Sequence, residues 1–334
     1  MLLTKTGLIE QKPLTLTDIP KPVPKDDQLL IKVSVCGACR TDLDQAEGRL
    51  TTTKLPVVPG HQIVGTVAEK GQKAENFKIG DRIGITWLNY ACGQCSFCKQ
   101  GLENLCSNAK FTGKDVNGGY AQYTIVPQNF AYNIPDKFSD SQAAPLLCAG
   151  VIGYRTVRLS QISDGQIIGI FGFGASAHIV IQIIKYKFPN SPVFVFTRKP
   201  NHQTLAESLG ADWTGSPTDA PPQKINIALD FTPAGKTIAN ALDVTEKAGR
   251  LVINAIRKED LVPQLDYTKH LWLEKKIQSV ANVTSKDAEE FLPLAAKIPI
   301  KTTVEEFPWK QANQVLYKIK HSKLQAAAVL KIEK

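Results

Sequence analysis

The sequence lacks three features that would each point to a different class of protein. No apolar run approaches the ~18–20 residues of a membrane-spanning helix, so we expect no membrane span. The first residues, MLLTKTGLIEQKPL, contain no cationic segment followed by an apolar core, so we expect no secretory signal peptide. No basic run is interleaved with aromatic residues and no nucleic-acid-binding motif occurs, so the net charge of +9 does not predict nucleic acid as a partner. That charge fits a solvated basic surface, or a preference for an anionic ligand such as a phosphorylated cofactor.

Cysteine is sparse outside one short segment, and its number is odd. Four of the seven cysteines lie within residues 92–106, which fits metal binding in a reducing cytoplasm better than a disulfide scaffold, so we expect a cytoplasmic protein. The spacing of Cys92, Cys95, Cys98 and Cys106 lets four thiolates meet at one tetrahedral centre. A zinc ion there would have no open position and would brace the loop. The alternative is a cluster of free thiols, which would be liable to oxidation.

A second set of ligand-type side chains is centred on the stretch from Val35 to Gly65. Cys39 and His61 lie in two loops of this stretch, and Cys148 in the segment APLLCAG is the best candidate for a third ligand. Thiolate and imidazole suit zinc, and a zinc with three protein ligands keeps an open position for chemistry. Taken alone, the first thiol and the imidazole could be two unrelated loop residues.

The 334 residues suffice for two domains, and the sequence pattern changes between them. Residues 1 to about 135 carry short β-branched runs punctuated by glycine and proline, which predicts β-structure with one short helix near residues 41–46. After Asp164, a buried-strand pattern at 166–171 leads through a glycine-rich turn to helical spacing at 179–187 and a second strand at 192–196. This βαβ unit predicts a parallel sheet of the dinucleotide-binding type.

The turn itself reads Gly172-Phe-Gly174-Ala175-Ser176-Ala177. Gly172 permits a tight turn, Gly174 lets the backbone approach a pyrophosphate at the helix N-terminus, and Ala177 replaces the third glycine of the fingerprint. We therefore predict a dinucleotide site in this turn. The alternative is a plain tight turn between strand and helix.

The second strand of this unit ends in Thr197-Arg198-Lys199. An NAD site usually carries Asp or Glu here, whereas an arginine suits a 2′-phosphate. One hydroxyl and two cations offer charge-assisted hydrogen bonds to a dianionic phosphate, so we predict NADP(H) in preference to NAD(H). A solvated basic loop is the alternative.

The rest of the chain continues the alternation of strands and helices and then returns to the first domain. Expected helices cover residues 205–210, 288–296 and 309–320, and expected strands lie near residues 302–304 and 326–332. The last strand would complete the β domain, which makes that domain discontinuous in sequence.

Several motifs, in the right order over nearly the whole chain, resemble one family. They are GACRTD, PGHQIVG, the GDR turn, CGQCSFC with its fourth cysteine, LLCAG, the GxGxxA turn, LGAD and AVLKI. With them the chain resembles a zinc-dependent alcohol dehydrogenase of the medium-chain dehydrogenase/reductase superfamily, and most nearly the bacterial propanol-preferring type. The resemblance implies an α/β protein with a GroES-like β-rich catalytic domain at residues 1–148 and 283–334 and a Rossmann domain at residues 149–282.

The resemblance also assigns roles to individual residues. It implies two zinc ions per chain, a catalytic one held by Cys39, His61 and Cys148 and a structural one held by Cys92, Cys95, Cys98 and Cys106. Arg40 would reach the cofactor pyrophosphate, Thr41 would accept and pass the alcohol proton, and Asp42 would orient His61. The substrate pocket would draw on both domains, including Trp87, Leu88, Phe111 and Ile152.

Two positions depart from the commoner family pattern. Gln62 stands where many members have Glu beside the histidine, and a neutral amide cannot supply that negative charge near the zinc. Asp44 stands where many members carry a histidine that ends the proton relay. We expect Asp44 at the surface, where its pKa near ~4 would make it a weak base.

The predicted function is transfer of hydride between NADP(H) and a primary alcohol or aldehyde. The alternatives are an NAD-dependent alcohol or polyol dehydrogenase, a zinc-free quinone or enoyl reductase, which the three ligands disfavour, and a catalytically silent NADP(H)-binding protein. By resemblance we also expect a homo-oligomer, a tetramer or a dimer.

Overall fold

The computed structural model describes residues 1–50, 54–324 and 327–332. The chain divides into two compact units, one formed by Met1–Val151 with Asn282–Lys334 and the other by Ile152–Ala281. Within the described residues, no helix is both long and apolar enough to cross a membrane.

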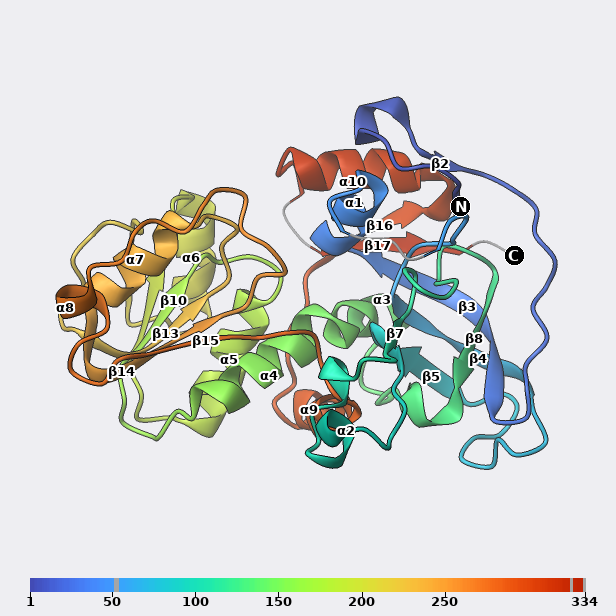
Figure 1. Ribbon diagram of the computed structural model, residues 1–334, viewed down its shortest axis with the longest axis horizontal. Helices are drawn as coiled ribbons and strands as arrows, with labels where there is room; N and C mark the ends of the chain where they lie inside the picture. The colour runs from blue at the N-terminus through green and yellow to red at the C-terminus, as the bar shows by residue number, and fades with distance from the viewer. Residues whose placement is uncertain (51–53, 325–326, 333–334) are drawn as a thin grey trace. The chain divides into compact units, whose positions relative to one another are not determined.

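The first unit is organised around a seven-stranded sheet in the order β16-β17-β3-β4-β5-β9, with β8 also paired to β3. Its central strand β3 (Gln28–Ala38) pairs with β4 along most of its length, through a register that sets Cys36 opposite Ile63. On its other side β3 pairs antiparallel with β17, so that the C-terminal segment completes the sheet begun near the N-terminus (Figure 1). The remaining strands are β4 (Gln62–Lys70), β5 (Arg82–Ile85), β8 (Tyr123–Pro127), β9 (Ala131–Asn133), β16 (Val304–Pro308) and β17 (Ala327–Lys331).

Short helices and two small two-stranded antiparallel sheets complete the first unit. The fully buried side chains Leu29, Ile31 and Ile63 belong to its core, because every second residue of a strand points to the same face. The two-stranded sheets are β1 (Leu2–Leu3) with β2 (Leu14–Thr15), and β6 (Leu88–Tyr90) with β7 (Lys110–Phe111). The helices are η1 (Ile9–Gln11), α1 (Arg40–Ala46), α2 (Ser96–Lys99), η2 (Glu103–Leu105), η3 (Gln128–Phe130), α3 (Asp140–Ala143), η4 (Ala144–Leu147), α4 (Ala149–Ser160), which continues into the second unit, α9 (Ser285–Lys297), η5 (Trp309–Gln311) and α10 (Ala312–Lys320).

The second unit is a six-stranded parallel sheet in the order β12-β11-β10-β13-β14-β15. Its central strands are buried along their whole length, as expected for a parallel sheet covered on both faces. The strands are β10 (Ile168–Phe171), β11 (Val193–Phe196), β12 (Trp213–Gly215), β13 (Ile225–Asp230), β14 (Thr245–Ile253) and β15 (Lys276–Ser279), and the helices are α5 (Ala177–Lys187), α6 (Pro200–Ser208), α7 (Lys236–Asp243) and α8 (Tyr267–His270). The predicted fold class, a GroES-like β-rich domain with a Rossmann-like parallel sheet, is confirmed.

Several element boundaries differ from those predicted. Helix α9 begins at Ser285, earlier than expected, because Thr284 caps it by accepting a hydrogen bond from the backbone N–H of Asp287. Helix α6 begins already at Pro200, a residue that suits the first helical turn. The segment expected as one helix from Trp309 is divided into η5 and α10. The last predicted strand starts at residue 326, which lies outside the described residues, and the observed β17 starts at Ala327.

Candidate metal and cofactor sites

Two groups of cysteine and histidine side chains meet in the first unit. The possible ligand atoms of Cys39, His61 and Cys148 all lie within 4.8 Å of one another. The same limit holds for the four sulfur atoms of Cys92, Cys95, Cys98 and Cys106. The structure therefore brings together both ligand sets that the sequence predicts.

Local structure explains how the first group converges. Cys39 follows the end of β3 and is the N-cap of α1, and its backbone N–H donates a hydrogen bond to Asp42 Oδ2 at 2.9 Å. The other carboxylate oxygen, Asp42 Oδ1, lies 3.1 Å from His61 Nδ1. Asp42 thus joins the loop of Cys39 to the imidazole, whose Nε2 is left facing Cys39 Sγ at 3.6 Å. Cys148 reaches the same place from the end of η4.

In this first group His61 is buried and the two cysteines are half-buried, and the close approach of their side chains shifts the pKa values of His61 and Cys39. Burial alone would lower the pKa of His61, but the charges of Asp42 and Cys39 raise it to about 10. Contact with the Cys148 thiol, followed by burial, raises the pKa of Cys39 well above its ordinary value. A bound divalent cation would relieve both effects, since it favours the thiolate and the neutral imidazole. The donor set, two sulfurs and an imidazole nitrogen held by a carboxylate, fits zinc.

The four-cysteine group is held by a short loop around α2. Backbone N–H groups point at its sulfurs: Cys95 donates to Cys92 Sγ and Asn108 donates to Cys106 Sγ, each at 3.4 Å. The N–H groups of Gln94 and Cys95 lower the pKa of Cys92 to about 6. These donors favour thiolates, which is the form that binds a metal.

In the second unit, the glycine-rich turn follows the carboxyl end of β10. This strand lies between β11 and β13, where the strand order reverses direction, which is the position at which open α/β sheets bind their ligands. Gly172 has φ +80°, and a side chain there would meet Thr232 at 2.8 Å. A side chain at Gly174 would meet no described atom within 4 Å, so the backbone is open to an incoming group there.

The remaining residues of the turn form the start of α5. Ser176 is the N-cap, and its carbonyl oxygen accepts a hydrogen bond from the N–H of Val180. Ala177 is fully buried, so a larger side chain at this position would have to displace its neighbours. Ala175 lies between Gly174 and this cap, in the part of the turn that the sequence predicts to face a pyrophosphate.

The residues predicted to bind a 2′-phosphate follow β11. Thr197 is buried, and its N–H donates to the carbonyl of Gly215 at 2.8 Å, whereas Arg198 and Lys199 are exposed. Asp219, near this segment, was not identified from the sequence as a residue of interest. Asp219 accepts a hydrogen bond from Ser216 N at 2.7 Å, in the turn that follows the neighbouring strand β12. The Pro-rich surroundings of Asp219 suggested only a surface connection.

Comparison with known proteins places the chain in a family. Residues 25–136 match the model of the alcohol dehydrogenase GroES-like domain. The probable alcohol dehydrogenase AdhA of Mycobacterium tuberculosis is 40% identical over 98% of this chain and 94% of its own. This chain is a zinc-dependent, medium-chain alcohol dehydrogenase by family.

Solved structures agree with this family at the level of the fold. An NAD-dependent alcohol dehydrogenase superposes with a TM-score of 0.91 at 20% identity, over 99% of both chains. The cobalt- and zinc-bound alcohol dehydrogenase of Pyrobaculum aerophilum gives 0.89 at 21% identity, over 99% of this chain and 98% of that one. The CAD of Helicobacter pylori, complexed with NADP(H), gives 0.84 at 22% identity, over 93% and 92%.

Within this alcohol dehydrogenase, the two unusual positions have unexpected surroundings. The prediction that Asp44 lies at the surface is wrong: it is 1% exposed, because α1 packs it inward and Arg49 Nε donates to its Oδ1 at 2.6 Å. Gln62 is also buried, and its Nε2 has no hydrogen-bond partner among the described residues. Arg40 and Thr41 are half-buried in the first turn of α1.

Aromatic side chains stand beside the imidazole. The ring centroid of Trp87 lies 5.8 Å from that of His61 and 4.9 Å from that of Phe111. The expectation that Leu88 lines a substrate pocket is wrong, because Leu88 is fully buried in the core of the first unit.

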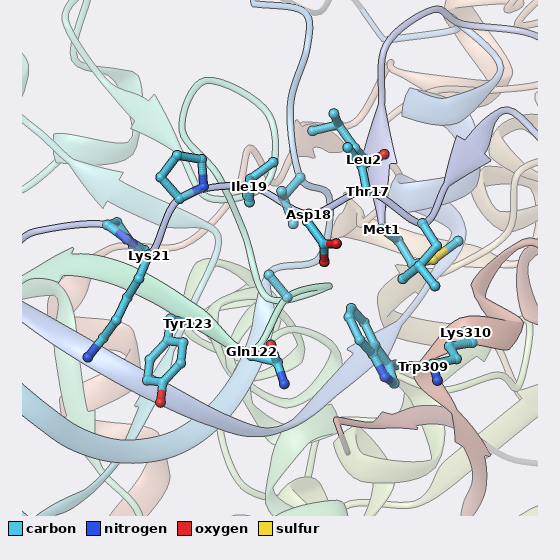
Figure 2. Close-up of a pocket in the computed structure, with 15 residues that line it drawn as sticks. Met1, Leu2, Thr17, Asp18, Ile19, Lys21, Gln122, Tyr123, Trp309 and Lys310 are labelled. Atoms are coloured by element: carbon cyan, nitrogen blue, oxygen red, sulfur yellow. The ribbon is translucent and has the colours of Figure 1, made fainter. Parts of the chain in front are cut away.

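A hollow of about 390 Å³ elsewhere in the first unit is not part of these sites. Figure 2 shows Trp309, Tyr123 and Lys21 around it, with residues 16–22 along one side. None of the predicted ligand or cofactor residues lines this hollow.

Proposed function

We propose that this alcohol dehydrogenase binds two zinc ions and transfers hydride between NADP(H) and a primary alcohol or its aldehyde. The observation that carries the proposal is the convergence of Cys39, His61 and Cys148, with Asp42 on the far nitrogen of the imidazole. Three protein ligands leave a fourth position for a substrate oxygen. A protein that only binds the cofactor would not need a metal site with three protein ligands and an open fourth position.

The chain's own residues would divide the work between holding, orienting and proton transfer. Zinc in the three-ligand site supplies Lewis-acid polarisation of the substrate oxygen, and the nicotinamide cofactor supplies or accepts the hydride. Asp42 keeps the proton of His61 on Nδ1, so that Nε2 is free to act as a ligand. Thr41, one residue before Asp42, carries the hydroxyl that would take the alcohol proton.

The route of that proton beyond Thr41 differs from the common family relay. Asp44 is buried and occupied by Arg49, so it has no direct contact with solvent through which to release a proton. We propose that the proton leaves Thr41 through water instead.

The preference for NADP(H) rests on the exposed cations after β11. An NAD site usually carries Asp or Glu at the end of this strand, whereas residues 197–199 contain no carboxylate. The nearby Asp219 already accepts a backbone hydrogen bond from Ser216. Arg198→Ala should raise KM for NADPH by about 10-fold or more, as expected for a lost charge-assisted contact, and leave KM for NADH within about twofold. Lys224→Ala, an exposed cation of the same unit, is the matched control. Equal effects on both cofactors would refute the assignment.

The first test of the whole proposal is an assay of zinc-replete protein with NADPH and NADH in parallel. Short, branched and aromatic aldehydes form the substrate panel, since Trp87 stands against His61 and should limit bulk on that side. Turnover with NADPH and two zinc ions per chain support the proposal. One zinc per chain and no turnover would support a zinc-braced cofactor-binding protein instead.

We also propose that the protein forms a homo-oligomer through the edge of the second unit's sheet. All four residues of the edge strand β15 are exposed, and exposed apolar side chains, Leu261 at 92% and Trp272 at 53%, lie in the segments before it. An uncovered strand edge beside apolar surface is a ready pairing site. Light scattering of the wild type and of Ile277→Lys tests this, with a shift toward monomer expected in the variant.

A further inference from the structure

The second unit contains a buried ion pair that the proposed mechanism does not use. Lys258 Nζ lies 2.6 Å from Asp230 Oδ2, and the side chain of Asp230 is completely shielded from solvent while that of Lys258 is 12% exposed. Asp230 ends β13 and Lys258 lies in the loop after β14, so the pair joins loops at the carboxyl ends of two neighbouring strands (Figure 1). Removing two charges from water is unfavourable, so stability alone is a poor reason for such a pair.

The ion pair holds one further residue, Thr232. Asp230 Oδ1 accepts hydrogen bonds from the backbone N–H of Thr232 at 2.8 Å and from its hydroxyl at 2.7 Å. Lys258 Nζ donates to the carbonyl oxygen of Thr232 at 2.8 Å. The N–H, the hydroxyl and the carbonyl of Thr232 are thus all bonded to the ion pair, which leaves this residue little freedom to rotate or shift.

Two more hydrogen bonds join the same two loops. Glu259 N donates to the carbonyl oxygen of Pro233 at 2.7 Å, and Gly235 N donates to Asp260 Oδ1 at 2.8 Å. Together with the ion pair, they fasten the loop after β13 to the loop after β14 at several points. The position of Thr232 is therefore fixed by the loop after β14 as well as by its own strand.

Thr232 lies directly against the glycine-rich turn. A Cβ at Gly172 would lie 2.8 Å from Cγ2 of Thr232, so the threonine methyl group fills the space beside this glycine. Toward β11, the N–H of Gly172 donates to the carbonyl oxygen of Phe196 at 2.8 Å. Gly172, which has φ +80°, is therefore held between β11 and Thr232. Its conformation sets the direction of the peptide groups that follow it in the turn.

We propose that Asp230 and Lys258 are positioning residues for the nicotinamide dinucleotide, which act through Thr232 on the glycine-rich turn. The inference rests on the proposed function, because it names residues that hold the cofactor site in shape. A pyrophosphate at the start of α5 needs backbone N–H groups already directed at it. A turn that is fixed before the cofactor arrives loses less conformational freedom on binding, which favours affinity.

The test is binding of NADPH and of NADH to the intact, zinc-loaded chain, followed by cofactor fluorescence. Titration gives the number of sites and Kd separately, and a partly unfolded sample loses sites without changing the Kd of those that remain. Thr232→Ser keeps the hydroxyl and removes the methyl group that lies against Gly172. It should raise Kd about threefold for both cofactors, because they share the pyrophosphate.

The ion pair is tested by a double variant, because Lys258→Met alone would leave a buried carboxylate unpaired, which is strongly destabilising. Lys258→Met combined with Asp230→Asn removes both charges and keeps an oxygen that can accept from Thr232. It should raise Kd about three- to tenfold for NADPH and NADH alike, with the number of sites unchanged. This pattern differs from that of Arg198→Ala, which should act on NADPH. In a Thr232→Ser background, the double change should have a smaller effect, since both act through one contact.

Lys185→Met combined with Asp212→Asn is the matched control. Lys185 Nζ lies 2.6 Å from Asp212 Oδ2, and Val193 N, at the start of β11, donates to the same oxygen at 2.7 Å. This pair therefore belongs to the amino edge of the same sheet, opposite the edge that carries the glycine-rich turn. Its removal should leave Kd within about twofold of the wild type for both cofactors.

Three results would overturn the inference. The first is a wild-type Kd for both cofactors in the Lys258→Met, Asp230→Asn variant with its sites intact. The second is a loss of affinity in this variant that adds in full to that of Thr232→Ser. The third is a wild-type Kd in Thr232→Ser, which decides the question even where the double variant has lost sites. A wild-type chain that binds neither NADPH nor NADH would instead refute the proposed function on which the inference stands.

Discussion

The two cysteine clusters of the first unit reach a similar density of ligand atoms by different routes. The four-cysteine cluster takes every sulfur from residues 92–106, and its backbone N–H groups point at the sulfurs. The three-residue cluster gathers its atoms from the end of β3, the start of β4 and the end of η4, and needs Asp42 to orient its imidazole. A local loop can fold around a metal by itself, whereas the second cluster depends on the sheet and the helices that deliver it. We therefore expect substitutions in the four-cysteine cluster to lower stability, and substitutions in the three-residue cluster to lower catalytic activity.

The largest expected effect is on catalytic activity and comes from the three-residue cluster. Cys148→Ser should reduce turnover to background and zinc content from two ions per chain to one, because a thiolate ligand is lost from a site with only three. Thermal unfolding should stay close to that of the wild type, and binding of NADPH, followed by fluorescence, should be retained. If Cys148→Ser kept the turnover of the wild type with one zinc per chain, the three-residue cluster would not be the site of the chemistry.

The structural half predicts a different pattern for the four-cysteine loop. Cys95→Ser should lower zinc content and thermal stability together, with Tm falling by roughly 6–12 °C if about 3 kcal/mol of stabilisation is lost. Differential scanning calorimetry with metal analysis measures both. Ser107→Ala, an exposed change in the same loop, should alter neither quantity. Unchanged zinc stoichiometry in Cys95→Ser would contradict the expectation.

A third variant separates orientation from ligation in the three-residue cluster. Asp42→Asn removes the charge that holds the His61 proton on Nδ1, and should lower kcat/KM or zinc affinity about 10–100-fold. Asp44→Asn provides the comparison, since Asp44 is an equally buried carboxylate of the same helix that bonds Arg49 rather than the imidazole. It should change zinc affinity less than about twofold. Equal effects of the two variants would mean that the charge of Asp42 has no specific role in orienting His61.

The smallest expected effect concerns the far end of α1, where Glu47 accepts hydrogen bonds from Lys320 Nζ and Ile9 N, each at 2.9 Å. Although burial opposes ionisation, the contacts with Lys320, Ile9 and Arg49 lower the pKa of Glu47 to about 2. Because the folded-state pKa lies below the unfolded one, the stabilisation is present above about pH 4.5 and is lost as pH falls toward 2.

Glu47→Gln should therefore lose about 1–2 kcal/mol of unfolding free energy at pH 6 and approach the wild type only near pH 2. Urea unfolding at several pH values measures this difference. Glu69→Gln, which breaks the exposed pair with Lys21, should have little effect at any pH. A constant difference for Glu47→Gln across the pH range would rule out the proposed titration.

Much of the fold could be predicted because its signals are local. The β-branched runs, the glycine-rich turn and the alternation of strands and helices are all readable within short windows, and they indicate the fold class that the structure has. The boundaries of α6 and α9 were missed because Pro200 and Thr284 start these helices before their apolar periodicity begins. Ligand type alone already made Cys148 the best candidate for a third ligand beside Cys39 and His61, and the family resemblance then assigned the three residues to one metal site.

The surroundings of the site were harder to predict, because they depend on contacts between distant segments. Nothing in the sequence near Asp44 shows that Arg49 will bury its charge, and the surface position expected for Asp44 was wrong for that reason. Asp230 and Lys258 are 28 residues apart, and no local pattern in the sequence pairs them. The roles of Arg198 in cofactor choice and of the seven zinc ligands stay predictions that the variants above test.

The pairing of β17 with β3 has a consequence for how the protein is made. During synthesis, the strand that ends just before Cys39 is available early, but its partner at residues 327–331 leaves the ribosome almost three hundred residues later. The four-cysteine loop, in contrast, is complete as soon as Cys106 has emerged. If zinc binds this loop as we propose, a nascent chain can acquire it while still attached to the ribosome, whereas the sheet beside Cys39 is completed only near the end of translation.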